Sequence, residues 1–208
     1  MSENEYFCNW SKVIDFGLLH KALREIKKLN LKDLCPSYVN IFKAFTLCKY
    51  EDLKIVVVGQ DPYPQRGVAT GLAFGNNRGG EISPSLEVLL KASGSEDCTL
   101  ESWAKQGVLL LNSSLTTIVG KTNIHGWIWR PFIKSLLHSI SISDRSLVFM
   151  LFGNEAQSFE DCIYKEGNFV LKEKHPSWYA RNSKEMSNEI FVKAQSIIKD
   201  YRNFDLIW

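Results

Sequence analysis

The chain has 208 residues and is 45% hydrophobic, so it can bury one sizeable core but has little room for a second. Its formal net charge of +2 permits a nucleic-acid partner without requiring one. The five cysteines are scattered and never spaced as C-x-x-C, which argues against a disulfide framework and against a zinc or iron–sulfur site. We therefore expect a single domain over residues 1–208, with reduced thiols.

Neither a secretory signal nor a membrane span is evident. The first nine residues lack a basic segment followed by an apolar one, and no apolar run reaches the roughly 20 residues that cross a bilayer. We expect a cytoplasmic protein, or a nuclear one if the source has a nucleus, without a membrane partner.

Two helical stretches open the chain. Apolar residues recur at helical spacing over residues 18–29, with lysines and an arginine on the other side. A second helical stretch is predicted to begin at Pro36 and to run through residue 47. Both are expected to serve packing.

Strands and helices alternate from residue 55 onward. The run Ile-Val-Val-Val-Gly at 55–59 predicts a strand that is buried on both faces, and similar runs lie at 108–111, 147–152 and 169–171. Helical patterns fall between and after them, at 84–90, 101–105, 128–140, 155–164 and 188–198. This alternation predicts an α/β fold of three layers, α/β/α, with a central, mainly parallel four-stranded sheet.

Polar residues follow each predicted strand. They are Asp61, Asn112, the Gly153-Asn154 pair and His175, with the aromatic residues Tyr63 and Phe74 nearby. Because the carboxyl ends of parallel strands meet at one edge, we expect these side chains at a common rim. An acid, an amide, an imidazole and a ring suit a planar heterocycle. Taken singly, Asp61 could begin a turn, Asn112 could cap one, Phe74 could be core and His175 could be structural.

Several motifs in chain order resemble those of uracil-DNA glycosylases of the main, strictly uracil-excising family. They are GQDPY at 59–63, GLAF at 71–74, PSL at 84–86, WAKQGVLLLN at 103–112, LT at 115–116 and HPS at 175–177. The resemblance runs from about residue 35 to the C-terminus. No nucleotide-binding glycine loop, serine-hydrolase elbow or metal-ligand cluster is evident.

The resemblance implies hydrolysis of the N-glycosidic bond of deoxyuridine in DNA, which releases uracil, leaves an abasic site and begins base-excision repair. Phe74 would stack on the flipped base, and Asn112 would pair with its O4 and N3–H edge. Tyr63 would stand against C5, where thymine carries a methyl group. Gln60 is a further expected substrate contact.

The same resemblance assigns the bond-breaking roles. Asp61 would stabilise the oxocarbenium-like sugar and orient the attacking water, and a neutral His175 would donate to O2 of the departing uracil. It implies no metal and no organic cofactor.

The resemblance also implies the DNA contacts. Ser85, Ser177 and the backbone of Gly153 and Asn154 would hold phosphates of single- or double-stranded DNA. Tyr179 would fill the space left by the base, with Trp178 beside it. We expect a monomer, and proteinaceous inhibitors of this family are a further expected partner.

The sequence departs from the family pattern around this chemistry. Pro64 replaces the histidine that commonly ends the first motif, Asn154 replaces a serine, and Trp178-Tyr179 replace a proline–leucine pair. The bond-breaking set is intact, so we expect activity. Pro64 is expected to cost one water contact near Asp61, and the other departures bear on DNA contact and on the filling of the space left by the base. His125 has no assigned chemistry and is interpreted as structural.

Two alternative functions stay open. A relaxed glycosylase that also accepts damaged or mismatched pyrimidines is disfavoured by Tyr63. A DNA-binding accessory protein that has lost the reaction is disfavoured by Asp61, Asn112 and His175.

Overall fold

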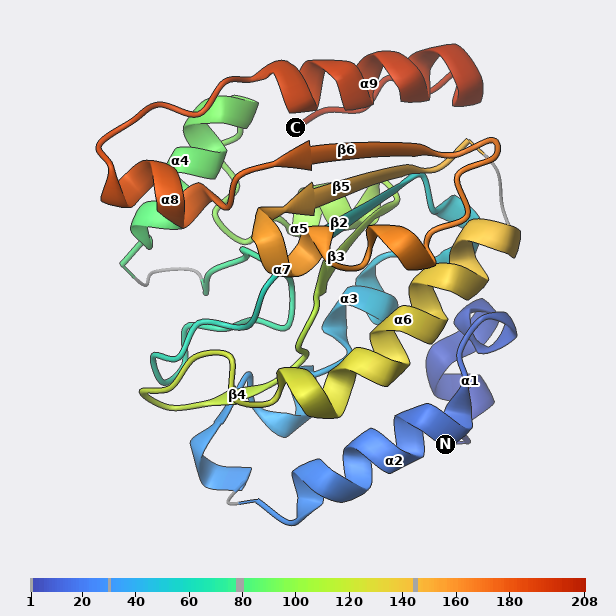
Figure 1. The fold of residues 1–208 in the computed structure, drawn as a ribbon, viewed down its shortest axis with the longest axis vertical. Helices are drawn as coiled ribbons and strands as arrows, with labels where there is room; N and C mark the ends of the chain where they lie inside the picture. The colour runs from blue at the N-terminus through green and yellow to red at the C-terminus, as the bar shows by residue number, and fades with distance from the viewer. Residues whose placement is uncertain (1, 30, 78–80, 144–145) are drawn as a thin grey trace.

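The computed structural model describes residues 2–29, 31–77, 81–143 and 146–208 (Figure 1). The helices of this part of the chain are α1 (Glu3–Phe7), α2 (Phe16–Lys27), α3 (Lys43–Leu47), α4 (Pro84–Ser93), α5 (Glu101–Lys105), α6 (Gly126–Ser143), α7 (Gly153–Gln157), α8 (Pro176–Arg181) and α9 (Glu189–Arg202). No helix among the described residues is long and apolar enough to cross a membrane. All five cysteines are free thiols.

The central sheet has four strands, which are β2 (Ile55–Gly59), β3 (Val108–Asn112), β5 (Val148–Phe152) and β6 (Phe169–Glu173). Their order is β3-β2-β5-β6, and each neighbouring pair is parallel. β2, β3 and β5 are buried along their whole length, as their apolar composition requires. The predicted four-stranded parallel sheet is therefore confirmed.

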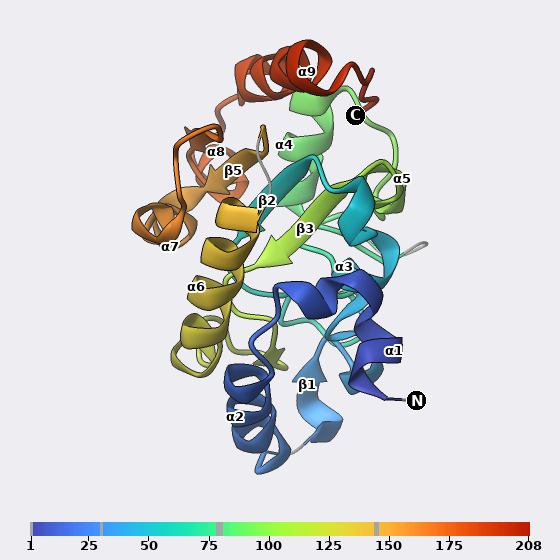
Figure 2. The same ribbon diagram turned by 90° about the vertical axis from the view of Figure 1, so that its right-hand side faces the viewer.

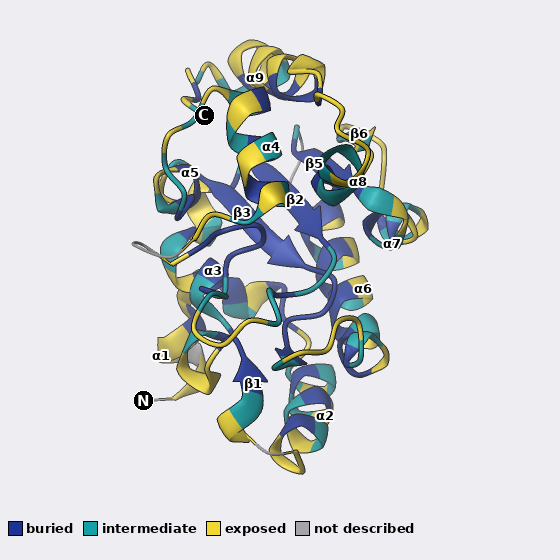
Figure 3. Cartoon of the chain, turned by 90° about the vertical axis from the view of Figure 1, so that its left-hand side faces the viewer, coloured by how far each residue is buried: buried dark blue, intermediate teal, exposed yellow. Residues whose placement is uncertain are grey.

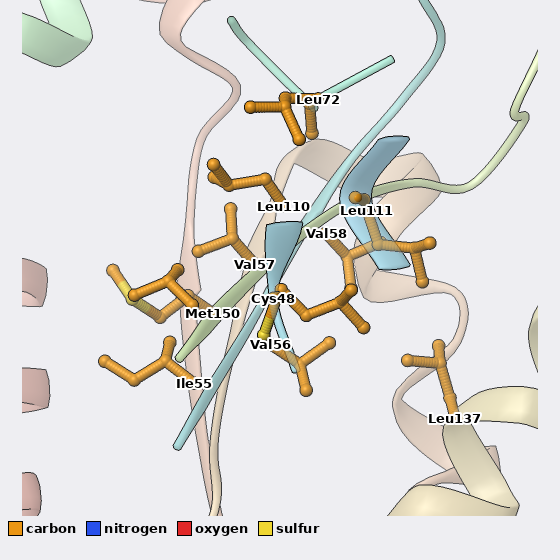
Figure 4. Close-up of a cluster of buried hydrophobic side chains, with 14 of the residues drawn as sticks. Cys48, Ile55, Val56, Val57, Val58, Leu72, Leu110, Leu111, Leu137 and Met150 are labelled. Carbon is orange, nitrogen blue, oxygen red and sulfur yellow. The ribbon is translucent and has the colours of Figure 1, made fainter. Parts of the chain in front are cut away.

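Helices cover both faces of this sheet, which confirms the three-layer prediction (Figure 2). α6 lies on one face with α2 on its outer side, and α4, α5 and α9 lie on the other. The strands form the buried centre, whereas the outer helix faces are exposed (Figure 3). The side chains of β2 pack there with Leu110, Leu137 and Met150 (Figure 4).

A second, two-stranded sheet was not predicted. β1 (Leu34–Cys35) pairs with β4 (Thr117–Ile118) in antiparallel register. Two residues are too few to show the alternation by which a strand is read from sequence.

Two predicted helix boundaries were wrong. The stretch expected from Pro36 forms a 3₁₀ turn at Tyr38–Asn40, and helix α3 begins only at Lys43. The helix expected over residues 155–164 begins at Gly153 and ends at Gln157, with a 3₁₀ turn at Glu160–Cys162 behind it. Gly153 has φ +85°, a conformation that allows the sharp turn from β5 directly into α7.

Candidate active site

The carboxyl edge of the sheet brings most of the predicted site residues into one cavity. Figure 1 shows α7 and α8 at the arrowhead ends of β5 and β6, beside this edge. The cavity is lined by Gln60, Asp61, Pro62, Tyr63, Ala69, Leu72, Phe74, Ser85, Asn112 and His175. All of the residues expected to bind or cleave the substrate are therefore together.

Asp61 lies on the loop that leaves β2 and is partly buried. The backbone N–H of Asn123 donates to its Oδ2 (2.7 Å). Burial raises the pKa of the Asp61 carboxyl above its ordinary value, while the Asn123 N–H acts in the opposite direction. The carboxylate is therefore held by one backbone donor in a poorly solvated place.

His175 precedes α8, and its ring is fixed by Ser177. The Ser177 N–H donates to His175 Nδ1 (3.2 Å), and Ser177 Oγ lies 2.8 Å from the same nitrogen. Because Nδ1 accepts the backbone hydrogen bond, the ring proton resides on Nε2. Burial, and secondarily the charge of Arg181, lower the pKa of His175 to about 4. The imidazole is therefore a neutral donor at physiological pH.

Asn112 ends β3 opposite Gly59, the last residue of β2. Asn112 is 7% exposed, and its side-chain amide forms no hydrogen bond with any described residue. A Cβ on Gly59 would lie 2.8 Å from Asn112 Oδ1 and 3.3 Å from the Phe74 ring. Glycine at 59 thus leaves room for an amide that is free to pair with a ligand.

The Phe74 ring lies against Phe152 and His175, with centroid distances of 5.5 Å and 5.4 Å. Its backbone has φ +65°, and its carbonyl accepts a hydrogen bond from the Tyr63 hydroxyl (2.9 Å). Ser83 Oγ in turn donates to the Tyr63 hydroxyl (2.9 Å). Burial raises the pKa of the Tyr63 phenol, which keeps it neutral. Tyr63 and Phe74, whose rings line the cavity, are therefore fixed relative to each other by this hydrogen bond.

A neighbouring groove receives most of the residues that were expected to contact DNA. It is lined by Gln60, Asn123, Gly153, Asn154, Glu155, Lys174, His175, Ser177, Trp178 and Arg181. Gln60 and His175 line both hollows, so the groove adjoins the cavity. Lys174 Nζ lies 3.7 Å from the centroid of the Trp178 ring, which places a cation on an aromatic surface beside the site.

All three side-chain hydroxyls that were predicted to contact DNA also have partners within the fold. Ser85 Oγ lies 3.1 Å from Ser83 Oγ. The Tyr179 hydroxyl donates to Glu173 Oε1 (2.7 Å), and Tyr179 lines neither hollow. Burial and the Glu173 carboxylate raise the pKa of Tyr179 to about 12. The Ser177 hydroxyl lies against His175. Ser177 therefore positions the imidazole as well as lining the groove.

Sequence reasoning missed two contributors to the site. One is Ser83, whose hydroxyl accepts from Leu86 N–H at the start of α4 and also donates to the Tyr63 hydroxyl. Asn123 acts through a backbone N–H, which no sequence motif marks. No cluster of three or more metal-binding side chains is found among the described residues.

Comparison with known proteins shows to which family the chain is related. The family model described as the Uracil DNA glycosylase superfamily matches residues 45–199. A uracil-DNA glycosylase of Campylobacter jejuni is 35% identical over 214 residues, which cover 96% of this chain and 92% of that protein. One of Aliarcobacter butzleri is 36% identical over 182 residues, covering 83% and 85%.

Solved structures show the same fold. The crystal structure of mimivirus uracil-DNA glycosylase superposes with a TM-score of 0.76 at 18% identity, covering 100% of this chain and 93% of that one. A Nitratifractor salsuginis structure gives a TM-score of 0.58 at 20% identity, covering 93% and 95%. The family match and the bacterial relatives settle the relationship: the chain belongs to the uracil-DNA glycosylase superfamily.

Proposed function

We propose that this chain hydrolyses the N-glycosidic bond of deoxyuridine in DNA, releases uracil and leaves an abasic site for base-excision repair. The observation that carries this proposal is the convergence of Asp61, Asn112 and His175 on one cavity beside Phe74. A member of this superfamily with that set of groups is an N-glycosylase, and uracil is the base that its relatives are named for.

The cavity supports recognition of a base taken out of the stack. Phe74 offers a ring face, and the Asn112 amide offers both a donor and an acceptor to the O4 and N3–H edge of uracil. Cytosine presents the opposite polarity at that edge and would leave the amide unpaired. Tyr63, held by Phe74 and Ser83, forms a fixed wall against the C5 position.

Cleavage develops positive charge on the sugar and negative charge on the uracil. Asp61, ionised and partly buried, stabilises the sugar cation and orients the water that attacks it. His175 donates from Nε2 to O2 of the leaving base, since its Nδ1 is occupied by Ser177. A neutral donor is the form that its lowered pKa maintains. Each positioned group of this kind contributes about 10²–10⁴-fold in rate.

The adjoining groove supports a path for the DNA backbone. Lys174 and Arg181 line it with the small residues Gly153 and Ser177 and with Trp178. Cationic side chains and free N–H groups hold phosphates without reading sequence, as a repair enzyme acting in any context requires. Ser85, at the first turn of α4, brings a hydroxyl to the lining of the cavity.

A direct assay tests the function. The protein is incubated with oligonucleotides that carry one uracil, one thymine opposite guanine, or neither, and alkali-labile abasic sites are counted. We expect cleavage of the uracil strand alone, and Asp61→Asn serves as the inactive control. No cleavage at high enzyme concentration would contradict the proposal, and comparable cleavage at the thymine mismatch would favour a relaxed pyrimidine glycosylase.

The proposal also covers the domain organisation, the oligomeric state, the cellular location and a protein partner. One apolar core links residues from Phe7 to Leu206, which supports a single domain over residues 1–208. We further propose that this domain acts as a monomer, in the cytoplasm or in the nucleus of a eukaryotic source. Mimivirus UNG variants have been crystallised in complex with UGI, which supports an inhibitor protein as a second partner. Light scattering with and without UGI tests both the monomer and the complex.

A further inference from the structure

We propose that residues 119–125 form a positioning loop for Asp61, and that a buried network of Thr116, His125 and Trp129 holds this loop in place. The proposal rests on the proposed function, since it assigns a role in the same reaction. It gives His125 a function that the sequence did not suggest.

The positioning loop forms hydrogen bonds to both ends of the segment 61–64, which carries the catalytic Asp61. Its Asn123 N–H donates to Asp61 Oδ2 (2.7 Å), and its Gly120 N–H donates to the Pro64 carbonyl (3.0 Å). Pro64 is the residue at which the first motif departs from the family pattern. In this chain the end of that motif is therefore tied to the positioning loop through its backbone.

The N-terminal half of the loop is fixed by its own hydrogen bonds. Val119 N–H donates to the Asp33 carbonyl (2.8 Å), Lys121 N–H donates to the Ile118 carbonyl (3.0 Å), and Thr117 Oγ1 donates to the Lys121 carbonyl (2.7 Å). These bonds join the loop to the small β1–β4 sheet. The otherwise unexplained two-stranded sheet thus supports the catalytic edge.

The C-terminal half depends on the buried network. Thr116 Oγ1 lies 3.0 Å from His125 Nδ1 and accepts a hydrogen bond from Trp129 Nε1 (2.7 Å). Thr116 and Trp129 are 0% exposed and His125 is 4% exposed. The His125 carbonyl also accepts from Ile128 N–H (2.9 Å) and Trp129 N–H (3.2 Å), which joins the loop to the start of α6.

The network is the inner support for an otherwise exposed turn. Residues 120–123 are exposed, and Asn123 has φ +55°, a left-handed conformation that most side chains disfavour. Only Ile124 separates Asn123 from the solvent-excluded His125. Loss of the Thr116 hydroxyl would leave the buried Trp129 Nε1–H and the buried His125 Nδ1 without this partner. It would thereby release the end of the turn that presents the Asn123 N–H.

The loop also determines which carboxylate oxygen of Asp61 is available to the substrate. Oδ2 is engaged by the loop, so Oδ1 is the oxygen available to the sugar cation and the water. The Asn123 N–H also favours the ionised carboxylate against the effect of burial. A displaced loop would therefore misorient the carboxylate and shift the carboxyl toward its protonated, inactive form.

The test compares Thr116→Val, which removes the hydroxyl at similar size, with Thr116→Ser, which keeps it. Steady-state uracil release, which yields kcat and KM, is measured across pH for both variants in the wild-type and Asp61→Asn backgrounds. For Thr116→Val we expect a kcat loss of about 10- to 100-fold with KM changed by less than about twofold, since misplacement of a catalytic group is costly. The acid limb of the pH–rate profile should move to higher pH. Thr116→Ser should restore both, and the loss should be several-fold smaller when Asp61 is already absent.

The outcomes separate this inference from the proposed function. If the wild type releases no uracil, the function itself fails. If the wild type is active but Thr116→Val lowers the rate equally in both backgrounds, or leaves the acid limb unmoved, the positioning role is wrong. Should Thr116→Val not fold, the exposed Asn123 gives a second pair: Asn123→Val, which disfavours positive φ, should lose more activity than Asn123→Gly, which accepts it. Equal losses would overturn the proposal.

Discussion

Gly153 and His175 meet where β5 and β6 end, at a separation that excludes any side chain on residue 153. A Cβ built there would lie 2.8 Å from the His175 Cβ and 3.5 Å from its Cδ2. Gly153 also has φ +85°, so glycine is required both by the backbone and by the space. The position of the imidazole is therefore set by a residue that contributes no functional group of its own.

Gly153→Ala is expected to lower kcat strongly, because the new methyl group displaces His175 from the leaving base. Gly94→Ala is the matched control: Gly94 has φ +76°, no atom within 4 Å of its Cβ position, and a place at the end of α4. Both variants should lose about 1–2 kcal/mol of stability from the positive φ. Only Gly153→Ala should lose activity, which uracil release at matched folded fractions will show. Equal activity of the two variants would contradict the role of the contact.

His175 should make the stability of the protein dependent on pH. Its pKa falls from 6.5 to about 4 on folding. Between pH 4 and pH 6.5, His175 is therefore protonated in the unfolded chain and neutral in the folded chain. The contribution to the free energy of unfolding is fully present above pH 6.5 and is lost as the pH falls toward 4. His175→Gln removes this linkage. The difference in Tm between wild type and variant should therefore shrink on acidification from pH 7 to pH 4.

Other groups titrate in the same range, so the variant comparison is essential. Burial also lowers the pKa of His125, which lies within the Thr116 network and remains in both proteins. Its contribution cancels in the difference between wild type and His175→Gln. A difference in Tm that is constant with pH would show that His175 is not held neutral by the fold.

The strands were predictable because their physics is local. Continuous β-branched and aliphatic runs such as 55–59 can only be buried on both faces, and the alternation with helices implies a parallel sheet. The β1–β4 pair could not be read, because its two-residue strands depend on each other and not on a local pattern. The start of α3 at Lys43 was missed for a related reason, since Pro36 resembles a helix start while tertiary packing places the helix later.

The site was predictable where side chains act and unpredictable where the backbone acts. Asp61, Asn112 and His175 stand at strand ends, so the parallel topology itself brings them together. The Asn123 N–H that holds Asp61 carries no side-chain signature. Tyr179 illustrates a different limit: its position suggests a DNA contact, but Glu173 at the end of β6 supplies its hydroxyl with a partner inside the fold.

Tyr63→Ala should admit thymine into the cavity, because it removes the wall at the C5 position. Tyr63→Phe is the control, since it keeps the ring and loses only the hydrogen bonds to Phe74 and Ser83. Thymine release from a duplex with a thymine–guanine mismatch, followed by mass spectrometry, should be detected for Tyr63→Ala alone. A Tyr63→Ala protein that releases uracil but no thymine would rule out steric exclusion by this residue.

Asp61→Asn should lower the activity of the protein and raise its stability at pH 7. It removes the charge that faces the sugar cation, so the rate of uracil release should fall by about 10²–10⁴-fold, while DNA affinity changes little. The same charge is unfavourable for folding: the folded-state pKa of Asp61 lies above its ordinary value of 3.8 because of burial. Its stabilising contribution is therefore present only at low pH, where the carboxyl is protonated, and is lost as the pH rises through the folded-state pKa.

Asparagine keeps an oxygen that can accept the Asn123 N–H but carries no charge at any pH. We therefore expect Asp61→Asn to unfold at a higher Tm than wild type at pH 7, with an advantage that diminishes as the pH approaches 4. Thermal denaturation across this range, beside single-turnover kinetics of the same preparations, measures both effects. A variant that is inactive but no more stable at pH 7 would show that the Asn123 N–H fully offsets the burial of the carboxylate. Catalysis at this edge of the sheet would then carry no cost in stability.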